Sequence, residues 1–168
     1  MHYIPIGIIV LAFALLVALK LIVARKDNDS EEDIYFLKDS LFSPAERSFF
    51  GVLESLCDEN TTIQSKVRLA DIFGLKKGLG RALWQRSFNR ISSKHVDFLL
   101  LRKADAQPLL GIELDDSSHD EGERVARDKF VDSVFSSAKL PILHFKVRQN
   151  YDQKEIFHRI EEALAERS

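Results

Sequence analysis

The stretch Gly111–Asp120, "GIELDDSSHD", joins the end of an apolar run to five side chains that can bind a cation or move a proton: Glu113, Asp115, Asp116, His119 and Asp120. Carboxylates this close together repel one another unless a positive charge lies among them. Magnesium and manganese ions take oxygen ligands and retain water molecules, which suits chemistry at phosphate groups. The stretch therefore predicts a site for Mg2+ or Mn2+, which would activate a bound water as a nucleophile.

A third carboxylate is expected beside the first two. The apolar runs "HVDFLLLR" and "PLLGIELD" are separated by the polar turn "KADAQ", a pattern typical of an antiparallel hairpin. Residues two apart on a strand share a face, so Glu113 and Asp115 should point together. The hairpin brings Asp97 towards the same end of the sheet. We therefore predict Asp97, Glu113 and Asp115 as the metal ligands.

The flanking pattern predicts the elements that hold this hairpin. Ser43, Pro44 and Glu46 form a capping box at the start of a helix. A strand should follow, with Ile63, Val67 and Leu69 on one face and Gln64, Lys66 and Arg68 on the other. The helix "RALWQRSFNRIS" should turn Leu83, Trp84, Phe88 and Ile91 inward, where core packing explains Trp84 and Phe88 better than base stacking.

The remaining elements complete an α/β fold. A helix over "EGERVARDKFVDSVFSSA", a strand over "PILHFKV" and a final helix starting at Asp152 follow the hairpin. A helix between the last two strands permits a right-handed crossover. We predict the order helix, strand, helical insertion, strand, strand, helix, strand, helix, with a mixed sheet covered on both sides. His144, within "PILHFKV", is interpreted as a strand histidine.

The N-terminal segment predicts a membrane anchor. Residues 3–24 are apolar except for Lys20, which is enough to cross a bilayer as a helix. The cations Lys20, Arg25 and Lys26 follow the apolar stretch, which argues against a cleaved signal peptide and places the N-terminus outside. The predicted protein is thus a single-pass protein of the bacterial inner membrane with residues 1–25 as anchor, 26–40 as an acidic linker and a cytoplasmic α/β domain over 41–168.

Charge and cysteine usage narrow the function classes. Cys57 is the only cysteine among 168 residues, which excludes an internal disulfide and a cysteine zinc cluster. From Ile34 onward, 21 basic and 21 acidic residues balance. The interval Lys66–Lys103 contains ten Lys or Arg residues but only two acids, Asp71 and Asp97. Such a block can attract nucleic acid, although it can also be a solvated face with its acids nearby in space.

These residues resemble a known nuclease superfamily. Asp97, the "IELD" of the next strand and a leading helix containing Glu46 look like the PD-(D/E)XK nucleases, and "ELDDSSH" resembles their very-short-patch repair endonuclease branch. The stretches "SPAER", "KVRLADIF", "FNRISSKHVDF" and "IELDDSSH" are also similar to a bacterial domain family of unknown function. The resemblance implies a restriction-endonuclease-like core of helix, three strands, helix and strand, with Asp97 and Glu113 as metal ligands and Glu46 as an additional acid.

The resemblance departs at one position. Where the superfamily motif has a lysine two residues after the second acid, this chain has Asp115. The cationic role must then fall to another residue, and the candidates are Lys94, His95, His119 and Arg127. His119 could act as a general base or phosphate contact. The residues expected to contact nucleic acid are Lys66, Arg90, Lys94, His95 and Arg127.

Three interpretations remain open at this point. The leading hypothesis is a membrane-anchored nuclease with Asp97, Glu113, Asp115, His119 and Glu46 in its active site. The second is a nuclease-like module that binds nucleic acid or protein without turnover, consistent with the missing motif lysine. In the third, salt bridges to Arg127 or Lys94 explain the carboxylates, and the chain is a structural or partner-binding membrane protein. Glu46 is explained by helix capping more readily than by catalysis.

Overall fold

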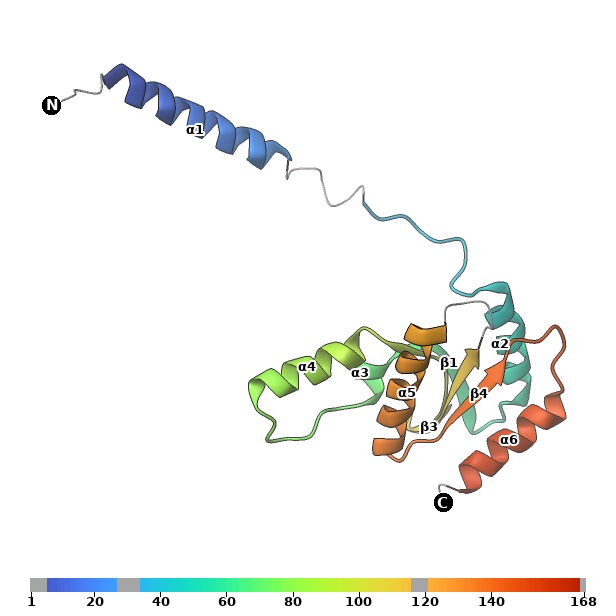
Figure 1. Cartoon of the computed structure of the whole chain (residues 1–168). Coiled ribbons are helices and arrows are strands. Elements are labelled where there is room, and N and C mark those ends of the chain that lie inside the picture. Colours follow the sequence, from blue (N-terminus) through green and yellow to red (C-terminus); the bar gives the residue numbers. More distant parts are fainter. Residues whose placement is uncertain (1–5, 27–33, 116–120, 167–168) are drawn as a thin grey trace. The chain divides into compact units, whose positions relative to one another are not determined.

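A computed structural model describes residues 6–26, 34–115 and 121–166, although the side chains of residues 121–127 and of part of the first helix are not described (Figure 1). The chain divides into two compact units, 1–41 and 42–168. The first contains helix α1, Ile6–Lys26. No helix of the described residues is both long and apolar enough to count as a membrane span. The structure therefore does not support the predicted transmembrane helix.

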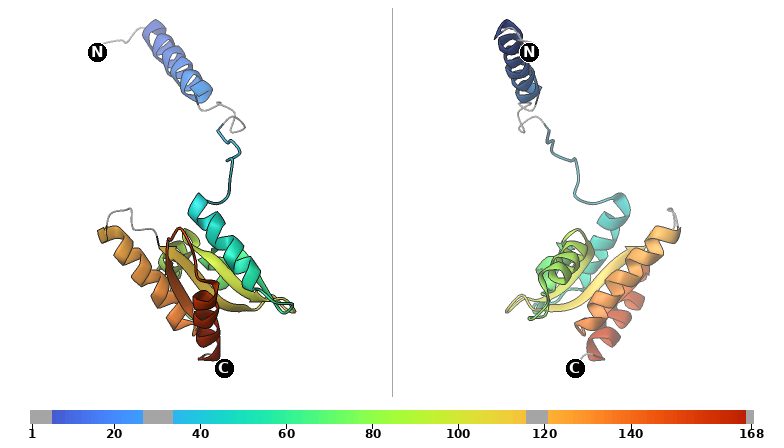
Figure 2. Two further views of the ribbon diagram at one scale, coloured as in Figure 1. Left: turned by 90° about the vertical axis from the view of Figure 1, so that its right-hand side faces the viewer. Right: turned by 60° about the vertical axis from the view of Figure 1, so that its left-hand side comes forward.

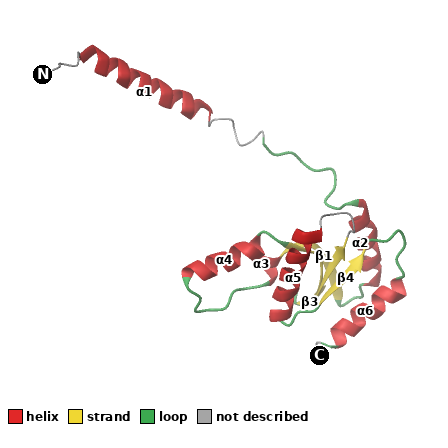
Figure 3. Ribbon diagram, in the orientation of Figure 1, coloured by secondary structure: helices red, strands yellow, loops and turns green. Residues whose placement is uncertain are grey.

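The second unit is a mixed α/β domain (Figure 3). Its elements in chain order are α2 (Pro44–Leu56), β1 (Thr61–Arg68), α3 (Leu69–Ile72), α4 (Arg81–Ser92), β2 (His95–Arg102), β3 (Pro108–Asp115), α5 (Glu121–Ser137), β4 (Ile142–Lys146) and α6 (Gln153–Ala165). The predicted order of elements is confirmed, including the helical insertion, which is α3 and α4.

The four strands form one mixed sheet in the order β1-β2-β3-β4. β1 pairs with β2 and β2 pairs with β3 in antiparallel fashion, whereas β3 and β4 are parallel. The predicted hairpin is confirmed, with Phe98 opposite Ile112 and Leu99 opposite Gly111. Parallel neighbours need a crossover, which here is α5.

Helices cover both faces of the sheet, with α2 and α6 on one side and α5 on the other (Figure 2). On the α2 and α6 face, Phe49 and Ile156 pack against Phe98 and Ile112 of the strands. On the α5 face, Val131 and Phe135 pack against residues of β2, together with Leu69 of α3 and Ile91 of α4. The sheet centre is therefore buried on both sides, which explains its nearly continuous apolar strands.

Strand β1 does not keep the predicted alternation. Ile63 packs with the α2 core, but Val67 packs with the α5 core, although the sequence pattern placed both on one face. The reason is Lys66, which lies between them with φ 55°. This left-handed conformation is uncommon for a residue with a side chain, and it reverses the side-chain direction of the strand from this position onward.

Helix α4 also differs from its prediction. Ile91 is buried as expected, but Leu83 and Trp84 are 47% and 41% exposed. The periodic pattern of apolar residues was therefore not sufficient to assign all four side chains to the core.

Strand β3 and helix α5 pack closely at Gly111, and a substitution there tests this packing. An added methyl group at Gly111 would overlap the ring of Phe135, which is fully buried. We expect Gly111→Ala to lower the free energy of unfolding by about 1–3 kcal/mol through overpacking. Chemical denaturation monitored by circular dichroism measures this change.

The matched control is Gly51→Ala in α2. A methyl group at Gly51 has open space around it, and alanine is the better helix former by about 0.5–1 kcal/mol. Replacing glycine by alanine should thus raise the free energy of unfolding at residue 51 and lower it at residue 111. An equal response at both positions would contradict the packing of α5 on β3.

Candidate functional site

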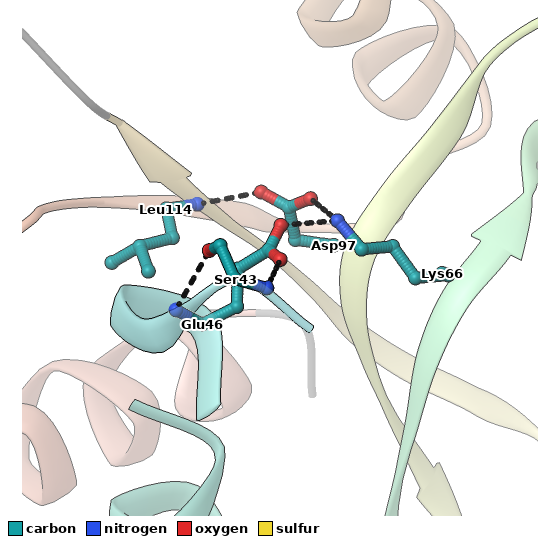
Figure 4. A network of polar contacts seen from close by, with 5 residues as sticks. All are labelled: Ser43, Glu46, Lys66, Asp97 and Leu114. Atoms are coloured by element: carbon teal, nitrogen blue, oxygen red, sulfur yellow. Dashed lines mark hydrogen bonds and ion pairs between the residues drawn. The ribbon is translucent and has the colours of Figure 1, made fainter. Parts of the chain in front are cut away.

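A lysine between two carboxylates lies where the ends of β1 and β2 meet α2 (Figure 4). The Lys66 ammonium donates to Glu46 Oε1 and, at 3.1 Å, to Asp97 Oδ1. The side chains of Lys66, Glu46 and Asp97 are 23%, 18% and 11% exposed. Three charged groups are therefore held together in a partly desolvated environment.

The local sequence explains how β1 and β2 deliver these side chains. The strand pairing runs in constant register from Thr61 opposite Arg102 to Arg68 opposite His95. The pairs on either side, Ser65 with Phe98 and Val67 with Val96, leave Lys66 and Asp97 opposite each other. Because Lys66 adopts a left-handed conformation, its side chain turns to the α2 face, where Glu46 lies, rather than to the α5 face. The unusual backbone is thus what brings the ammonium to the carboxylates.

Glu46 has two roles at once. Its Oε2 accepts the backbone N–H of Ser43 at 2.8 Å, and Ser43 in turn caps the backbone N–H of Glu46, so the predicted capping box is confirmed. The other oxygen of Glu46 accepts from Lys66. Capping therefore does not compete with a role in the site, because it fixes the orientation of the carboxylate that faces Lys66.

Asp97 bridges the ends of two strands. Its Oδ2 accepts the backbone N–H of Leu114 at 3.1 Å, while the β2–β3 pairing at this end begins with Phe98 opposite Ile112. The carboxylate therefore satisfies a backbone donor of β3 next to Glu113. Asp97 and Glu113 are the two buried charged residues among the described part of the chain, at 8% and 7% exposure. Acidic side chains are rarely buried to this extent unless they are paired with a cation or hydrogen-bonded.

The ion pairs determine the charge state of the site. Burial acts to lower the pKa of Lys66, but the hydrogen bonds to Glu46 and Asp97 outweigh it, so this pKa is raised above its usual value. Burial acts to raise the pKa of Glu46, and the bonds from Lys66 and Ser43 outweigh it, so this pKa is lowered. At neutral pH, Lys66 is therefore a cation and Glu46 an anion.

The other acids of β3 belong to the opposite face. Leu110, Ile112 and Leu114 pack in the α2 core, so Glu113 and Asp115 alternate towards α5. Asp115 lies 3.5 Å from Nδ1 of His144, whose Nε2 is 2.9 Å from Asp132 of α5. Burial acts to lower the pKa of His144, but the contacts with Asp132 and Asp115 outweigh it and raise this pKa. His144 is thus a satisfied strand histidine, as interpreted from the sequence.

The predicted ligands therefore contact different partners. Asp97 is bonded to Lys66 and the Leu114 amide, whereas Asp115 faces His144 across the sheet. Within the ranges that the structure describes, no group of three or more His, Cys, Asp or Glu side chains is arranged to hold a metal ion.

The predicted nucleic-acid contacts lie near the base of the α3–α4 insertion. Arg90 and Lys94 lie 4.0 and 5.5 Å from the ring centre of Phe130 in α5. His95 is exposed at the start of β2. His119 and the side chain of Arg127 are outside the described residues.

Lys66 itself was predicted only as a nucleic-acid contact, and its place between the two acids was missed. Nothing in the residue types marks it, because a lysine on the polar face of a strand pattern predicts a solvated side chain. The only signal is the register, which places Lys66 opposite Asp97, and this register is known only once the strands are paired.

The His144 contacts predict a pH dependence of stability. Because the folded pKa is raised above the ordinary value, the stabilisation is complete below that value and is lost as the pH rises through the folded pKa. We expect His144→Asn to destabilise the protein more at pH about 5.5 than at pH about 8.5. Urea unfolding at both values measures this. His158→Asn, at an exposed position of α6, provides the background response, and an equal loss at both pH values for His144→Asn would contradict the contact.

Comparisons with known proteins identify a family but no activity. The family model described as a protein of unknown function, DUF2726, matches residues 38–164. No curated protein and no solved structure matches the chain. The comparisons give no link to the PD-(D/E)XK superfamily or to very-short-patch repair endonucleases. The matched region includes α2, the whole sheet and the Lys66 site. The chain therefore belongs to the DUF2726 family.

Proposed function

We propose that the domain over residues 42–168 is a nuclease-like domain that hydrolyses phosphodiester bonds with a bound Mg2+ or Mn2+. One observation carries the proposal: the Lys66 ammonium lies between the buried or half-buried carboxylates of Glu46 and Asp97, beside the strand that carries Glu113. This provides a cation next to the acids, which is the component that the sequence pattern lacks at position 115.

The topology supports this proposal. The core from α2 to β4, apart from the α3–α4 insertion, has the order helix, strand, strand, strand, helix, strand, with an antiparallel hairpin followed by a parallel crossover. This is the order that the resemblance to PD-(D/E)XK nucleases implies. Asp97 on β2 and Glu113 on β3 occupy the positions that the resemblance gives to the acids, whereas Lys66 comes from β1. A fold alone does not establish an activity, so the argument depends on the site.

The donor atoms fit a hard divalent cation. Oxygens of Glu46 and Asp97 bond the same nitrogen of Lys66, so they converge on one position for a positive charge. Mg2+ in phosphate-handling sites is held by one or two carboxylates, with water and substrate phosphate as the other ligands. Asp97 and Glu46 would hold the ion in place of the Lys66 ammonium, whereas Glu113 lies on the neighbouring strand and faces α5. The ion would act as a Lewis acid on the phosphate oxygens.

Lys66 would stabilise charge rather than accept a proton. Since its pKa is raised, the side chain carries its proton at neutral pH and cannot serve as a general base. Once an ion replaces it between the two carboxylates, the Lys66 ammonium beside them would be able to bond a phosphate oxygen as negative charge develops on that oxygen. His119 remains the predicted general base.

A second candidate is a nuclease-like module that binds without turnover. It is favoured by the same ion pairs, because the Lys66 ammonium already occupies the position between Glu46 and Asp97 that a metal ion would need. The two candidates differ in one property: cleavage requires metal, whereas binding to the basic insertion does not. Measuring both in the same preparation separates them.

We also propose that α1 attaches the chain to a membrane, with the domain on the cytoplasmic side. The large apolar side chains described in α1 are exposed, including Leu11 at 75% and Leu15 at 70%. Although no described helix meets the criteria of length and apolarity for a membrane span, the 21 helical residues of α1 extend about 31 Å, close to the thickness of the hydrocarbon core of a bilayer. Lys20 and the two cations after it lie at the C-terminal end, consistent with an inside location of that end.

The nuclease proposal is tested with the full-length protein in mild detergent. We expect Mg2+- or Mn2+-dependent cleavage of DNA or RNA, and a loss of at least about 100-fold in Asp97→Asn and in Lys66→Met, because the first removes a proposed metal ligand and the second removes the cation that would bond the phosphate. Gel analysis of end-labelled single-stranded and duplex substrates provides the rates.

The matched control is Arg102→Gln, which breaks the exposed ion pair with Asp105 at the other end of β2. It should leave cleavage unchanged. Thermal unfolding of each variant separates loss of folding from loss of chemistry. Absence of cleavage by the wild type with either metal, or full activity of Asp97→Asn, would overturn the proposal.

The membrane proposal is tested by fractionation. The wild-type protein should stay in the membrane pellet after alkaline extraction. Replacing both Leu15 and Leu16 by arginine places two charges at the centre of α1, each costing about 2.5–3.5 kcal/mol in a bilayer, and should release the protein. Release of the wild type under the same extraction would contradict membrane attachment.

A further inference from the structure

The α3–α4 insertion, residues 69–94, forms an arm that begins and ends at the proposed active site. It leaves the sheet after β1, three residues beyond Lys66, and returns at β2, three residues before Asp97. The backbone N–H of Leu69 donates to Lys94 O at 2.8 Å, which closes the base of the arm. Figure 1 shows α4 at the opposite side of the domain from α2 and α6. The two ends of the arm therefore lie within three residues of Lys66 and of Asp97.

The arm carries six basic residues and one acidic residue. No Asp or Glu occurs between Ile72 and Lys94, whereas six cations do: Lys76, Lys77, Arg81, Arg86, Arg90 and Lys94. The one acid of the arm, Asp71, bonds Arg68 at 2.7 Å. Five of the six cations are exposed, Lys94 being the half-buried one. This is the kind of electrostatic surface that attracts a polyanion.

The arm also carries a flat aromatic pair. The rings of Trp84 and Phe88 have centres 5.0 Å apart and planes within 9° of parallel. Phe88 is half-buried, whereas Trp84 is 41% exposed, so Phe88 supports one face of an indole that still contacts solvent. Arg81 and Arg86 flank Trp84 on the same exposed helix. Aromatic rings beside cations are the combination by which proteins bind single-stranded nucleic acids, with bases on the rings and phosphates on the cations.

We propose that the α3–α4 arm binds single-stranded nucleic acid, with an unpaired base stacked on Trp84 and the backbone held by the arginines and lysines of the arm. A base within a duplex is already stacked on its neighbours and cannot offer its face to Trp84, so the aromatic pair favours a single strand. The inference deepens the proposed nuclease function, on which it rests for the choice of substrate class.

Tryptophan fluorescence can detect a base bound at Trp84, because Trp84 is the only tryptophan in the chain. The probe is an oligothymidine of about 16 nucleotides, added to the full-length protein in detergent and EDTA to prevent cleavage. We expect quenching of the tryptophan fluorescence, with an affinity that falls steeply as salt increases. A duplex containing the same strand should quench less and bind more weakly.

The variants separate stacking from charge. By fluorescence anisotropy of a labelled oligothymidine, Trp84→Ala should weaken binding roughly tenfold, and Trp84→Phe should restore most of it. Arg81→Gln with Arg86→Gln should weaken binding and reduce its salt dependence. The control cation is Arg102, which is bonded to Asp105 outside the arm, so Arg102→Gln should bind as the wild type does.

Three results would overturn the inference: no quenching by the single strand, equal quenching by duplex, or unchanged binding in Trp84→Ala. A blue shift of Trp84 with phosphatidylglycerol vesicles but no response to oligothymidine would assign the arm to the membrane surface instead. Quenching without metal-dependent cleavage would contradict the proposed nuclease activity but support binding of single strands by the arm. Cleavage with unchanged binding in Trp84→Ala would support the nuclease activity but contradict binding at Trp84.

Discussion

The position of the Lys66 ammonium between Glu46 and Asp97 is the constraint on which the rest of the site depends. Three charged groups leave water together, which costs free energy that only their mutual contacts can offset. Each group is held by a different element, so removing one leaves unpaired charge at the junction of α2, β1 and β2. The left-handed backbone of Lys66 is maintained in this setting, because the alternative strand conformation would point the ammonium to the other face of the sheet.

The sheet separates two polar clusters that lie close together along the chain. Glu113 and Asp115 alternate to the α5 face, where Asp115 faces His144 and Asp132, whereas Asp97 turns to the α2 face. The Leu114 amide is the link between the two sides, since it binds Asp97 while its own residue lies between Glu113 and Asp115. A domain organised in this way holds acids on both faces of one end of the sheet, with their orientation set by hydrogen bonds and ion pairs.

The α3–α4 insertion adds positive charge next to this end of the sheet. It extends the chain between the residue that supplies the cation and the residue that supplies the buried acid, and it adds six cations but only one acid. The contacts of Arg90 and Lys94 with Phe130 attach its base to α5. The proposed site and the proposed binding surface are therefore connected through the same two strand ends.

The order of elements, the hairpin and the capping box were predictable from residue types, because they follow from local periodicity and from hydrogen bonds between neighbouring residues. The partners of the acids were not. Whether Asp97 meets Lys66 or Asp115 depends on one residue with positive φ and on which face each strand presents, and these are set by packing between segments 20 to 31 positions apart. The exposure of Trp84 was likewise decided by tertiary structure, since helical spacing states which residues share a face but not whether another element covers that face.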